Sequence, residues 1–218
     1  MSAASAAPAP PRPGRRERTK RHNRAAILDA ARRVFAESGY EASSIRDIVR
    51  RSGLAAGTFY NYFPDKQSVL LALLEDRTEV LRRRLRLARA RARDFEGLVG
   101  DAYRVYFGFL ADDPPTAELL RRNSGAVRAL AGEPALLGGV DDLLGDLRAT
   151  ITGGDAPSFD VEYMAAAMAG AGFEIGVRML ARRPHDVEGA ARFATGLFLG
   201  GVERLAGSGG APRTDGEG

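Results

Sequence analysis

The side chains best suited to polar recognition are concentrated in one short segment, GTFYNYFPDK. They supply hydroxyl, amide and ammonium groups at Thr58, Tyr60, Asn61, Tyr62 and Lys66. Threonine and asparagine can address base edges in a major groove, and tyrosine hydroxyls can donate to phosphate oxygens. A lysine at the start of a helix can hold a phosphate together with the free amides of that helix. These residue types favour a surface that grips DNA, provided that the local structure turns them outward.

The residues around this segment predict two short helices joined by a tight turn. Ser44 and Asp47 have the three-residue spacing of a capping box, which marks the start of the first helix. Gly53 supplies the positive φ that the turn requires. The second helix is expected over about residues 55–63, because Pro64 stops it. Two helices joined in this way form a helix-turn-helix.

A preceding helix, predicted over residues 24–39, must hold this pair in place. Its apolar residues recur at helical spacing and the run stops at a glycine, which is a common helix end. Phe59 and Phe63 are expected to point inward against it. Tyr60 and Tyr62 do not follow the apolar stripe, so they are expected to point outward.

Positive charge is concentrated in the first part of the chain. Residues 1–100 carry 21 Lys and Arg against 11 Asp and Glu, whereas the remainder carries 11 against 17. This balance favours a polyanion-binding module attached to another domain, although a charged helical surface of uneven sign is the alternative. Residues 1–22 are rich in Ala, Pro and Arg and predict a disordered basic arm, which can follow phosphates or enter a minor groove.

The segments ILDAARRVFAESGYEASS and SIRDIVRRSGLAAGTFYNYFPDKQSVLLALLE resemble the DNA-binding domain of TetR/AcrR-type transcriptional repressors. The resemblance covers about residues 24–75 and is most specific in GTFYNYFPDK. It implies a homodimer that places the third helix of each subunit in the major groove of a palindromic double-stranded operator and that a small-molecule effector releases. The positions that it implies at the DNA are Thr58, Tyr60, Asn61, Tyr62 and Lys66, and we further expect Arg46, Ala55, Ala56 and Gly57 at the DNA.

Two positions depart from the pattern of that family. The family commonly has Ser or Thr at position 55 and often Lys or Arg at position 56, but both residues are alanine here. The missing helix cap is expected to cost about 1 kcal/mol of local stability. The missing cation removes one phosphate or guanine contact. Affinity for DNA is therefore expected to depend more on the N-terminal arm, Arg46 and the tyrosines.

The whole chain is predicted to be all-α, with about nine helices, because no segment shows the sustained alternation of a strand. The rear helices are expected over residues 66–91, 95–113, 116–130, 133–154, 159–182 and 186–205. The first of these is expected to have a charged outer face. The predicted order is a disordered basic arm, a helix-turn-helix DNA-binding domain, an effector-binding and dimerisation domain and a flexible tail, over residues 1–22, 23–69, 70–206 and 207–218.

Two residue patterns in the rear helices bear on a dimer interface and on an effector pocket. Small residues are dense in AAAMAGAGFEIG and FATGLFLGG, which suits either a two-fold four-helix dimer interface or tight packing within one subunit. Aromatic and methionine side chains at helical spacing are either plain core or the lining of an effector pocket. The candidate pocket residues are Tyr103, Tyr106, Phe107, Leu110, Met164, Met168 and Phe173. Such side chains would suit an apolar or aromatic effector.

Other functional classes find little support in the sequence. Cysteine is absent, and His22 and His185 are far apart, so neither a metal site nor a cofactor is expected. The sequence has no recognisable catalytic motif, so the chain is not expected to be an enzyme. No apolar run reaches the roughly 20 residues of a membrane span, and the N-terminus lacks the apolar part of a secretory signal, which favours the cytoplasm. A helical protein–protein adaptor with a basic face is the alternative, and it would show no sequence preference on DNA.

Overall fold

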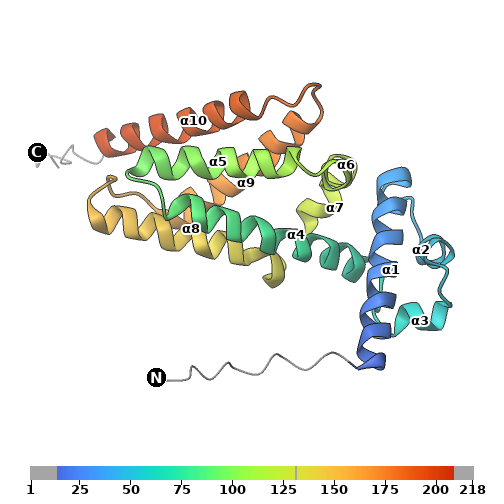
Figure 1. Cartoon of the computed structure of the whole chain (residues 1–218). Coiled ribbons are helices and arrows are strands. Elements are labelled where there is room, and N and C mark those ends of the chain that lie inside the picture. Colours follow the sequence, from blue (N-terminus) through green and yellow to red (C-terminus); the bar gives the residue numbers. More distant parts are fainter. Residues whose placement is uncertain (1–13, 131, 209–218) are drawn as a thin grey trace, which may run out of the picture.

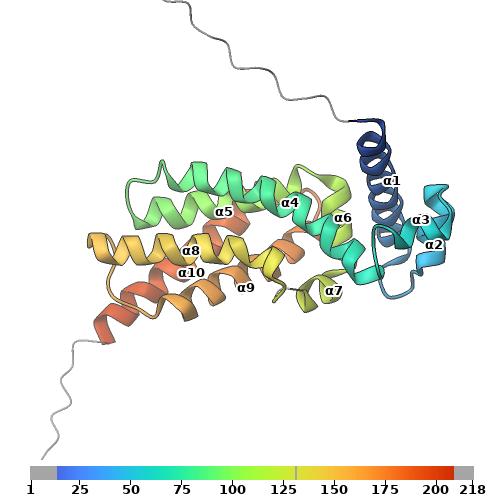
Figure 2. The ribbon, with the colours of Figure 1, turned by 90° about the horizontal axis from the view of Figure 1, so that it is seen from below.

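The computed structural model describes residues 14–130 and 132–208, and these residues form ten α-helices and no β-strand. The prediction of an all-α fold is confirmed, with one helix more than expected. The helices are α1 (Arg15–Ser38), α2 (Ile45–Ser52), α3 (Ala56–Tyr60), α4 (Lys66–Arg89), α5 (Phe95–Ala111), α6 (Pro114–Arg122), α7 (Ser124–Ala129), α8 (Pro134–Gly153), α9 (Val161–Leu180) and α10 (Val187–Ser208). Helices α4, α5, α8, α9 and α10 form an elongated bundle, and α1, α2 and α3 lie together at one end of it (Figure 1). Helix α4 reaches from the bundle to this end group (Figure 2).

Helices α1, α2, α3 and the first turns of α4 share one hydrophobic core. Its fully buried side chains include Ile27, Phe35, Ile48, Phe59 and Val69. Phe63 is also buried, so the inward position expected for both phenylalanines of the GTFYNYFPDK segment is confirmed. Burying a side chain of this size contributes about 1.5–3 kcal/mol. This burial explains how a helix of only five residues, α3, is held in place.

The turns that position α2 and α4 carry the signals expected from the sequence. The Ser44 hydroxyl accepts from the Asp47 amide, and the Asp47 carboxylate accepts from the Ser44 amide at 3.0 Å. Gly53 ends α2 with φ at 69°, a left-handed conformation that is costly for other residues. Asp65 caps α4 by accepting from the Ser68 amide at 2.7 Å. These local signals fix where α2 begins and ends and where α4 begins.

Helix α5 lies at the centre of the rear helices, where it contacts α4, α6, α9 and α10. The fully buried side chains of this second core include Val99, Phe107, Leu147 and Ala194. Glycines on α9 allow this helix to approach α5 closely. A Cβ at Gly176 would lie 2.8 Å from Leu110 Cδ1, and one at Gly172 would lie 3.3 Å from Tyr103 Cε1. These two glycines therefore serve packing within the subunit.

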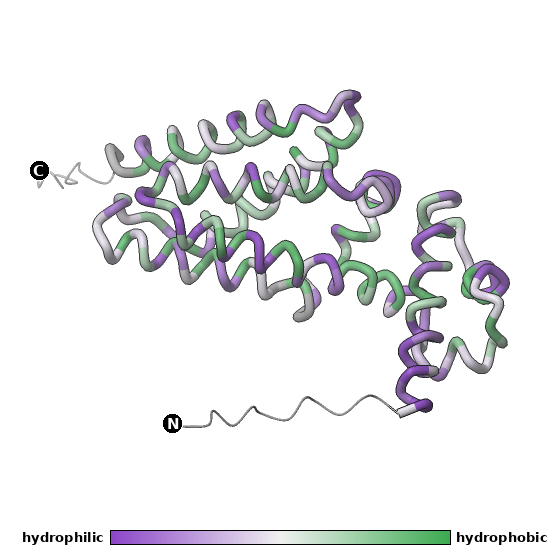
Figure 3. Tube along the Cα trace, in the orientation of Figure 1, coloured by the Kyte–Doolittle hydropathy of each residue, from purple (hydrophilic) through white to green (hydrophobic). Residues whose placement is uncertain are grey.

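Helix α1 begins earlier than the sequence predicts. It starts at Arg15, whereas the predicted helix starts at residue 24 and residues 1–22 are predicted to be a disordered arm. The correction concerns residues 15–22, whose arginine, lysine and glutamate side chains are good helix formers. They extend a helix that is already anchored by the buried face of α1, and extending a helix costs less than starting one. Figure 3 shows this added part of α1 as hydrophilic. Residues 1–13 lie outside the described residues.

Other boundaries also differ from the predicted ones. The helix predicted over residues 116–130 is divided at Asn123 into α6 and α7, because the Asn123 side chain bonds to backbone groups of the α1 end. Pro114, predicted to end the preceding helix, instead begins α6. Proline suits a first helical position, where its missing N–H has no partner to lose. Helix α10 continues to Ser208, and residues 209–218 of the predicted tail lie outside the described residues.

Candidate DNA interface and ligand cavity

Helix α3 presents most of the candidate DNA-contacting residues on the surface. It is shorter than the predicted helix over residues 55–63, and Ala55 stands at its N-cap without a side-chain hydrogen bond. The exposed candidates are Arg46, Ala55, Ala56, Gly57, Tyr60 and Asn61, whereas Thr58, Tyr62 and Lys66 are half-buried. The exposed fraction of Tyr60 is 56%, which confirms its outward position. The buried Phe59 holds the opposite side of the helix to the core.

Two arginines at the end of α2 are already paired within the N-terminal helices. Arg50 donates to Asp47 at 2.9 Å, and Arg51 donates to both Glu37 oxygens at 2.5 and 2.7 Å. Side-chain hydrogen bonds hold the pKa of each of these carboxyl groups below its ordinary value, so both stay ionised at neutral pH. Arg46 is exposed and makes no ion pair with another described residue. Arg46 is therefore the α2 cation that is available to a phosphate.

Tyr62 is half-buried rather than turned fully outward. Its ring packs against the N-terminal core. The same side chain lines a surface hollow with Arg15, Arg16, Thr19 and Lys20 of α1. A tyrosine hydroxyl beside several cations is a suitable arrangement for a phosphate group. The sequence analysis missed this neighbourhood, because it placed residues 15–22 outside the folded part.

Lys66 has internal partners that the sequence did not reveal. Its Nζ donates to the Tyr40 carbonyl at 2.6 Å and to the Ser43 carbonyl at 2.9 Å. It also lies 4.2 Å from the centre of the Tyr40 ring. The ammonium group therefore fastens the loop between α1 and α2 to the start of α4. Contact of Lys66 with a phosphate stays a prediction, and it would use the remaining N–H of the ammonium.

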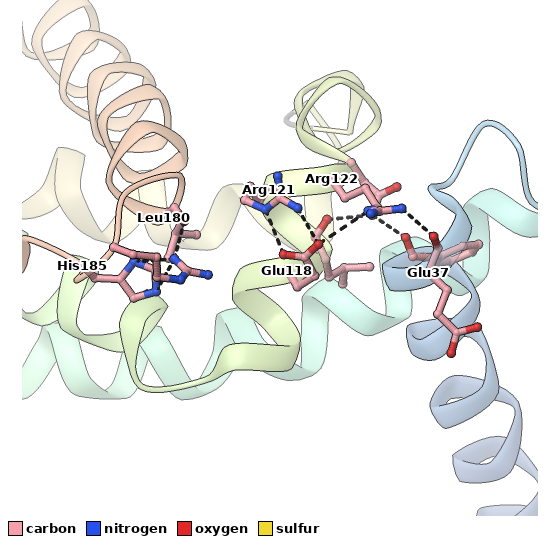
Figure 4. A network of polar contacts seen from close by, with 10 residues as sticks. Glu37, Glu118, Arg121, Arg122, Leu180 and His185 are labelled. Carbon is pink, nitrogen blue, oxygen red and sulfur yellow. Dashed lines mark hydrogen bonds and ion pairs between the residues drawn. The ribbon is translucent and has the colours of Figure 1, made fainter.

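Helix α6 contacts both α1 and the rear helices α5 and α9, and Figure 4 shows Glu118 and Arg122 of α6 beside Glu37 of α1. The Arg122 guanidinium donates to the Glu37 carbonyl at 2.5 Å. The buried Asn123 side chain donates to the Phe35 carbonyl at 3.2 Å and accepts from the Tyr40 amide. The bonds to the Glu37 carbonyl and the Tyr40 amide satisfy backbone groups at the end of α1, whereas the Phe35 carbonyl also accepts from the Gly39 amide. A displacement of α6 would therefore be passed directly to α1.

A cavity of about 210 Å³ lies among α4, α5, α8 and α9. Most of its surface is apolar. Its lining residues are Thr78, Leu81, Arg82, Leu85 and Arg89 of α4, Ala102, Tyr103 and Tyr106 of α5, Leu136, Gly139, Val140 and Leu143 of α8, and Met168, Ala169 and Gly172 of α9. A concave, mostly apolar surface with a few polar groups is the usual form of a small-molecule site.

Only part of the candidate effector pocket lines this cavity. Its lining includes Tyr103, Tyr106 and Met168, whereas Phe107, Leu110 and Met164 are buried in the rear core. Phe173 packs toward α7, where the Arg128 guanidinium lies 5.6 Å from the centre of its ring. The candidates are therefore divided between the cavity, the core and the contact of α9 with α7.

The sequence analysis missed the sides of the cavity that α4 and α8 form. The lining residues of α4 recur at helical spacing at Thr78, Leu81, Arg82, Leu85 and Arg89. This periodicity was a usable signal, but the arginines made the face resemble a charged exterior. Arg89 corrects that interpretation, because its side chain is only 6% exposed.

The two arginines of the cavity lie near aspartates of α8. Arg82 donates to both Asp142 oxygens at 3.1 Å each. Arg89 Nε lies 2.8 Å from Asp146 Oδ2, although its N–H is not aligned for a hydrogen bond. The hydrogen bond from Arg82 holds the pKa of Asp142 below its ordinary value. Burial raises the pKa of Asp146, and the charge of Arg89 offsets this only in part.

The two tyrosines of the cavity are neutral hydrogen-bond donors. Burial raises the pKa of both Tyr103 and Tyr106, so their hydroxyl groups stay protonated at any physiological pH. The Tyr103 hydroxyl donates to the Met168 carbonyl at 3.0 Å. The Tyr106 hydroxyl makes no hydrogen bond within the described part of the chain, so a ligand can accept from it.

The described residues contain neither a helix that could span a membrane nor a group of side chains that could hold a metal ion. None of the described helices combines the length and apolar character needed to cross a membrane. The described histidine, aspartate and glutamate side chains form no group of three or more that could hold a metal ion.

Residues 27–73 match the family described as bacterial regulatory proteins, tetR family. An HTH-type transcriptional repressor of Mycobacterium tuberculosis is 38% identical over 77 residues, which cover 35% of this chain and 37% of that protein. The fatty acid metabolism regulator protein of Bacillus subtilis is 40% identical over 58 residues, which cover 27% of this chain and 30% of that protein. The chain thus matches about a third of the length of these curated relatives.

Solved structures match over most of the chain. The fatty acid degradation regulator FadR from Bacillus halodurans has a TM-score of 0.68 at 25% identity, over 83% of this chain and 96% of that chain. The transcriptional regulator FadR from Bacillus subtilis, solved in complex with stearoyl-CoA, has a TM-score of 0.68 at 23% identity, over 82% of this chain and 98% of that chain. At these identities the likeness concerns the arrangement of the helices.

Proposed function

Because the chain belongs to the TetR family of bacterial regulatory proteins, we propose that it is a transcriptional repressor that binds a palindromic operator as a dimer and is released by a small apolar effector. The observation that carries the proposal is the helix-turn-helix, in which the core fixes Phe59 and leaves Tyr60 and Asn61 exposed. A short helix held rigidly from behind can enter a major groove without rearrangement. On this proposal the protein acts in the cytoplasm and performs no enzymatic reaction.

The proposed contacts divide into two kinds. Asn61 and the methyl and hydroxyl of Thr58 are proposed to address base edges, where they can discriminate between base pairs. Tyr60, Tyr62 and Arg46 are proposed to bind phosphates and so to set the register on the duplex. The cations at the start of α1, beside Tyr62, extend this phosphate-binding surface. Such a surface loses affinity steeply as the salt concentration rises.

The proposed dimer interface lies on α9 and α10. Their outward faces carry large exposed apolar side chains, with exposed fractions from 52% to 78%, at Tyr163, Phe193, Leu197 and Leu205. Small exposed residues on the same helices are Ala166, Ala167, Gly170 and Gly196. A second copy can approach closely over small residues and cover the apolar ones. A two-fold axis there would give the pair of α3 helices the symmetry of a palindrome.

The effector is proposed to occupy the cavity among α4, α5, α8 and α9. Helix α4 lines this cavity from Thr78 onward, while Val69 and Leu70 in its first turns belong to the N-terminal core. A ligand that repositions α4 would therefore change the spacing of the two α3 helices. Release from the operator would reflect the difference in ligand affinity between the two spacings. The stearoyl-CoA complex of the Bacillus subtilis relative supports a ligand site in this fold.

A footprint with the full-length protein on DNA that flanks its own gene tests the proposal. We expect protection of a palindrome, stronger than on random competitor DNA and weakened by added salt. Addition of an apolar effector is expected to remove the protection. Binding with no preference over competitor DNA would instead support a helical adaptor with a basic face.

The proposed dimer is tested with Leu197→Arg, which places a charge on the exposed apolar face of α10. We expect the sedimenting mass to halve and the operator affinity to fall more than tenfold, because half-sites then bind one at a time. The matched control is Leu87→Arg on α4, where the side chain is 62% exposed but distant from the proposed interface. A dimer that survives Leu197→Arg and dissociates with Leu87→Arg would contradict the assignment.

A further inference from the structure

Arg89, one of the residues that line the cavity, is a buried cation whose Nε and Nη2 donors are unused and shielded from solvent. The Arg89 side chain is 6% exposed, yet neither Nε nor Nη2 makes a hydrogen bond of acceptable geometry. Nε lies 2.8 Å from Asp146 Oδ2 and Nη2 lies 4.0 Å from Asp142 Oδ2. The guanidinium is therefore close to two carboxylates without being aligned with either. Buried donors are normally satisfied, so an exception calls for a physical reason.

Arg82 shows what a purely structural pair looks like in the same place. Both its Nε and its Nη2 donate to Asp142, so the pair ties α4 to α8 with two hydrogen bonds. Gly138 of α8 makes room for it, since a Cβ there would lie 2.6 Å from Arg82 Nη1. Because Asp142 is already occupied and α4 is already tied to α8, Arg89 is not needed for that link.

The charged groups on the wall of the cavity are donors, and its neutral polar side chains are the hydroxyls of Thr78, Tyr103 and Tyr106, which can donate and accept. Among the described lining residues the charged side chains are Arg82 and Arg89, and no carboxylate is present. The Tyr103 hydroxyl is engaged with the Met168 carbonyl, whereas the Tyr106 hydroxyl has no partner among the described residues. A complementary ligand must therefore carry acceptors, and beside a guanidinium the best acceptor is an anion.

We propose that this cavity binds a small apolar monocarboxylate, whose carboxylate pairs with Arg89 and whose apolar body lies against the leucine, valine and methionine side chains of the wall. The inference rests on the proposed effector control and specifies the class of effector. The planar fork of a guanidinium matches the two oxygens of a carboxylate, which favours recognition by geometry as well as by charge.

The volume of the cavity limits the size of this acid. At about 210 Å³ it is smaller than the roughly 300–1,000 Å³ of sites for drug-sized ligands. A dry cavity of about 150 Å³ accommodates benzene. A single aromatic ring with a short substituent, or a short acyl chain, therefore matches the available space. A long-chain acyl thioester of coenzyme A would extend beyond it.

Calorimetry on the full-length protein without DNA tests the proposal directly. The probes are 4-ethylbenzoate and hexanoate, each compared with its uncharged amide, 4-ethylbenzamide or hexanamide. We expect at least one of the two acids to bind at least tenfold more tightly than its amide. Comparison of 4-ethylbenzoate with hexanoate distinguishes an aromatic acid from a short-chain fatty acid. Amides that bind as tightly as their acids, or the absence of binding by both acids, would overturn the proposal.

Variants assign the carboxylate to Arg89. Arg89→Met keeps the length of the side chain and removes its charge, so we expect at least a tenfold loss for the acid and no loss for the amide. The matched control is Arg86→Met on the same helix, where the side chain is 51% exposed and does not line the cavity. We expect this control to keep the preference for the acid, and its loss there would count against the assignment.

A second variant guards against an effect on folding. Arg89→Met leaves Asp146 without its nearby cation, so the double variant Arg89→Met/Asp146→Asn removes both charges together. Circular dichroism verifies that both variants retain their helices. A folded double variant that still prefers the acid tenfold would overturn the role of Arg89.

The two proposals can fail separately. Calorimetry without DNA reports on the cavity alone, whereas the footprint reports on the operator alone. If an uncharged apolar compound releases the operator and neither acid does, the repressor function stands. The proposal that the effector is a carboxylate is then overturned. Tight binding of an acid with no operator preference would overturn the repressor function and leave the carboxylate site standing.

Discussion

The surface of α3 and the wall of the cavity hold their polar groups in opposite settings. On α3, Tyr60 and Asn61 are exposed, so water satisfies their hydrogen bonds until a binding partner, proposed to be DNA, replaces it. In the cavity, Arg89 is buried and its unused donors have no such substitute. When an exposed group exchanges a hydrogen bond with water for one with a partner, the net gain in free energy is small. When a buried charged donor that lacks a hydrogen bond receives an acceptor, the gain is larger. The surface must therefore collect many weak contacts, while the cavity can rely on one strong contact.

The two regions also have separate hydrophobic cores, and α4 and α6 join them. The core of the N-terminal helices includes Leu119 of α6, Val127 of α7 and Leu130, which follows α7. The core of the rear helices includes Ala117 of α6. Helix α6 thus contributes to both cores, and its last residues hold the end of α1. A change in the cavity has a short route to the surface of α3 because α4 and α6 each contribute side chains to both cores.

Replacing one buried phenylalanine in each core tests this separation most strongly. Phe59→Ala is expected to lower the free energy of unfolding of the N-terminal helices by about 3–5 kcal/mol and to abolish operator binding. Ligand binding in the cavity should persist. Phe107→Ala, equally buried in the rear core, is the matched variant and should lose ligand binding first. Thermal unfolding measures the stability, calorimetry the ligand binding and footprinting the operator binding. If each variant loses both ligand binding and operator binding, the two cores unfold as a single cooperative unit.

The elements around α3 could be predicted because their signals are local. Ser44 and Asp47 mark the start of α2, and Gly53 marks its end. Asp65 marks the start of α4. Each signal acts through a hydrogen bond or a backbone angle within a few residues. The start of α1 was missed because Arg15 lies beyond the apolar stripe, and only the extension of an existing helix makes that stretch helical.

The cavity could be predicted only in part, because its walls come from four helices that are distant in sequence. Tyr103, Tyr106 and Met168 could be nominated from their stripes, but nothing local distinguishes them from Phe107, which is plain core. Arg89 resembled an exterior residue, since its burial depends on α8 covering it. Burial of a charge is a property of the assembled helices, and a single helical pattern does not contain it.

Removal of the Asn123 side chain tests the connection between the two regions. Asn123→Ala leaves the Tyr40 amide without its partner and removes one of the two donors to the Phe35 carbonyl, which is expected to cost about 1–3 kcal/mol. The ratio of operator affinities without and with effector is also expected to move toward one. Ser124→Ala, at the next position, is the control that should change neither quantity. An unaltered ratio in Asn123→Ala would show that the signal travels by α4 alone.

Tyr62→Phe tests the surface at a single hydroxyl. The ring, which packs against the N-terminal core, is retained, so the unfolding temperature should not change. Loss of one phosphate hydrogen bond is expected to cost about 0.5–1.5 kcal/mol, which corresponds to a loss of roughly twofold to thirteenfold in operator affinity. Effector affinity should be the same as in the original protein. A gel-shift titration measures the loss, and an unchanged operator affinity would remove Tyr62 from the phosphate-binding surface.

Ala55→Ser tests whether a more stable α3 raises the operator affinity while the cavity is unchanged. A serine at this N-cap can accept from the amide of Gly57 or Thr58, which should add about 0.5–1 kcal/mol to the stability of α3. A helix that frays less before binding loses less entropy on the operator, so affinity should rise by up to about fivefold for that energy. Ala56→Ser places the same hydroxyl inside the helix, where it cannot cap, and should give neither gain. Equal gains from both serines would attribute the effect to a new DNA contact, whereas a gain from position 55 alone would show that the contact surface is limited by the stability of its own short helix.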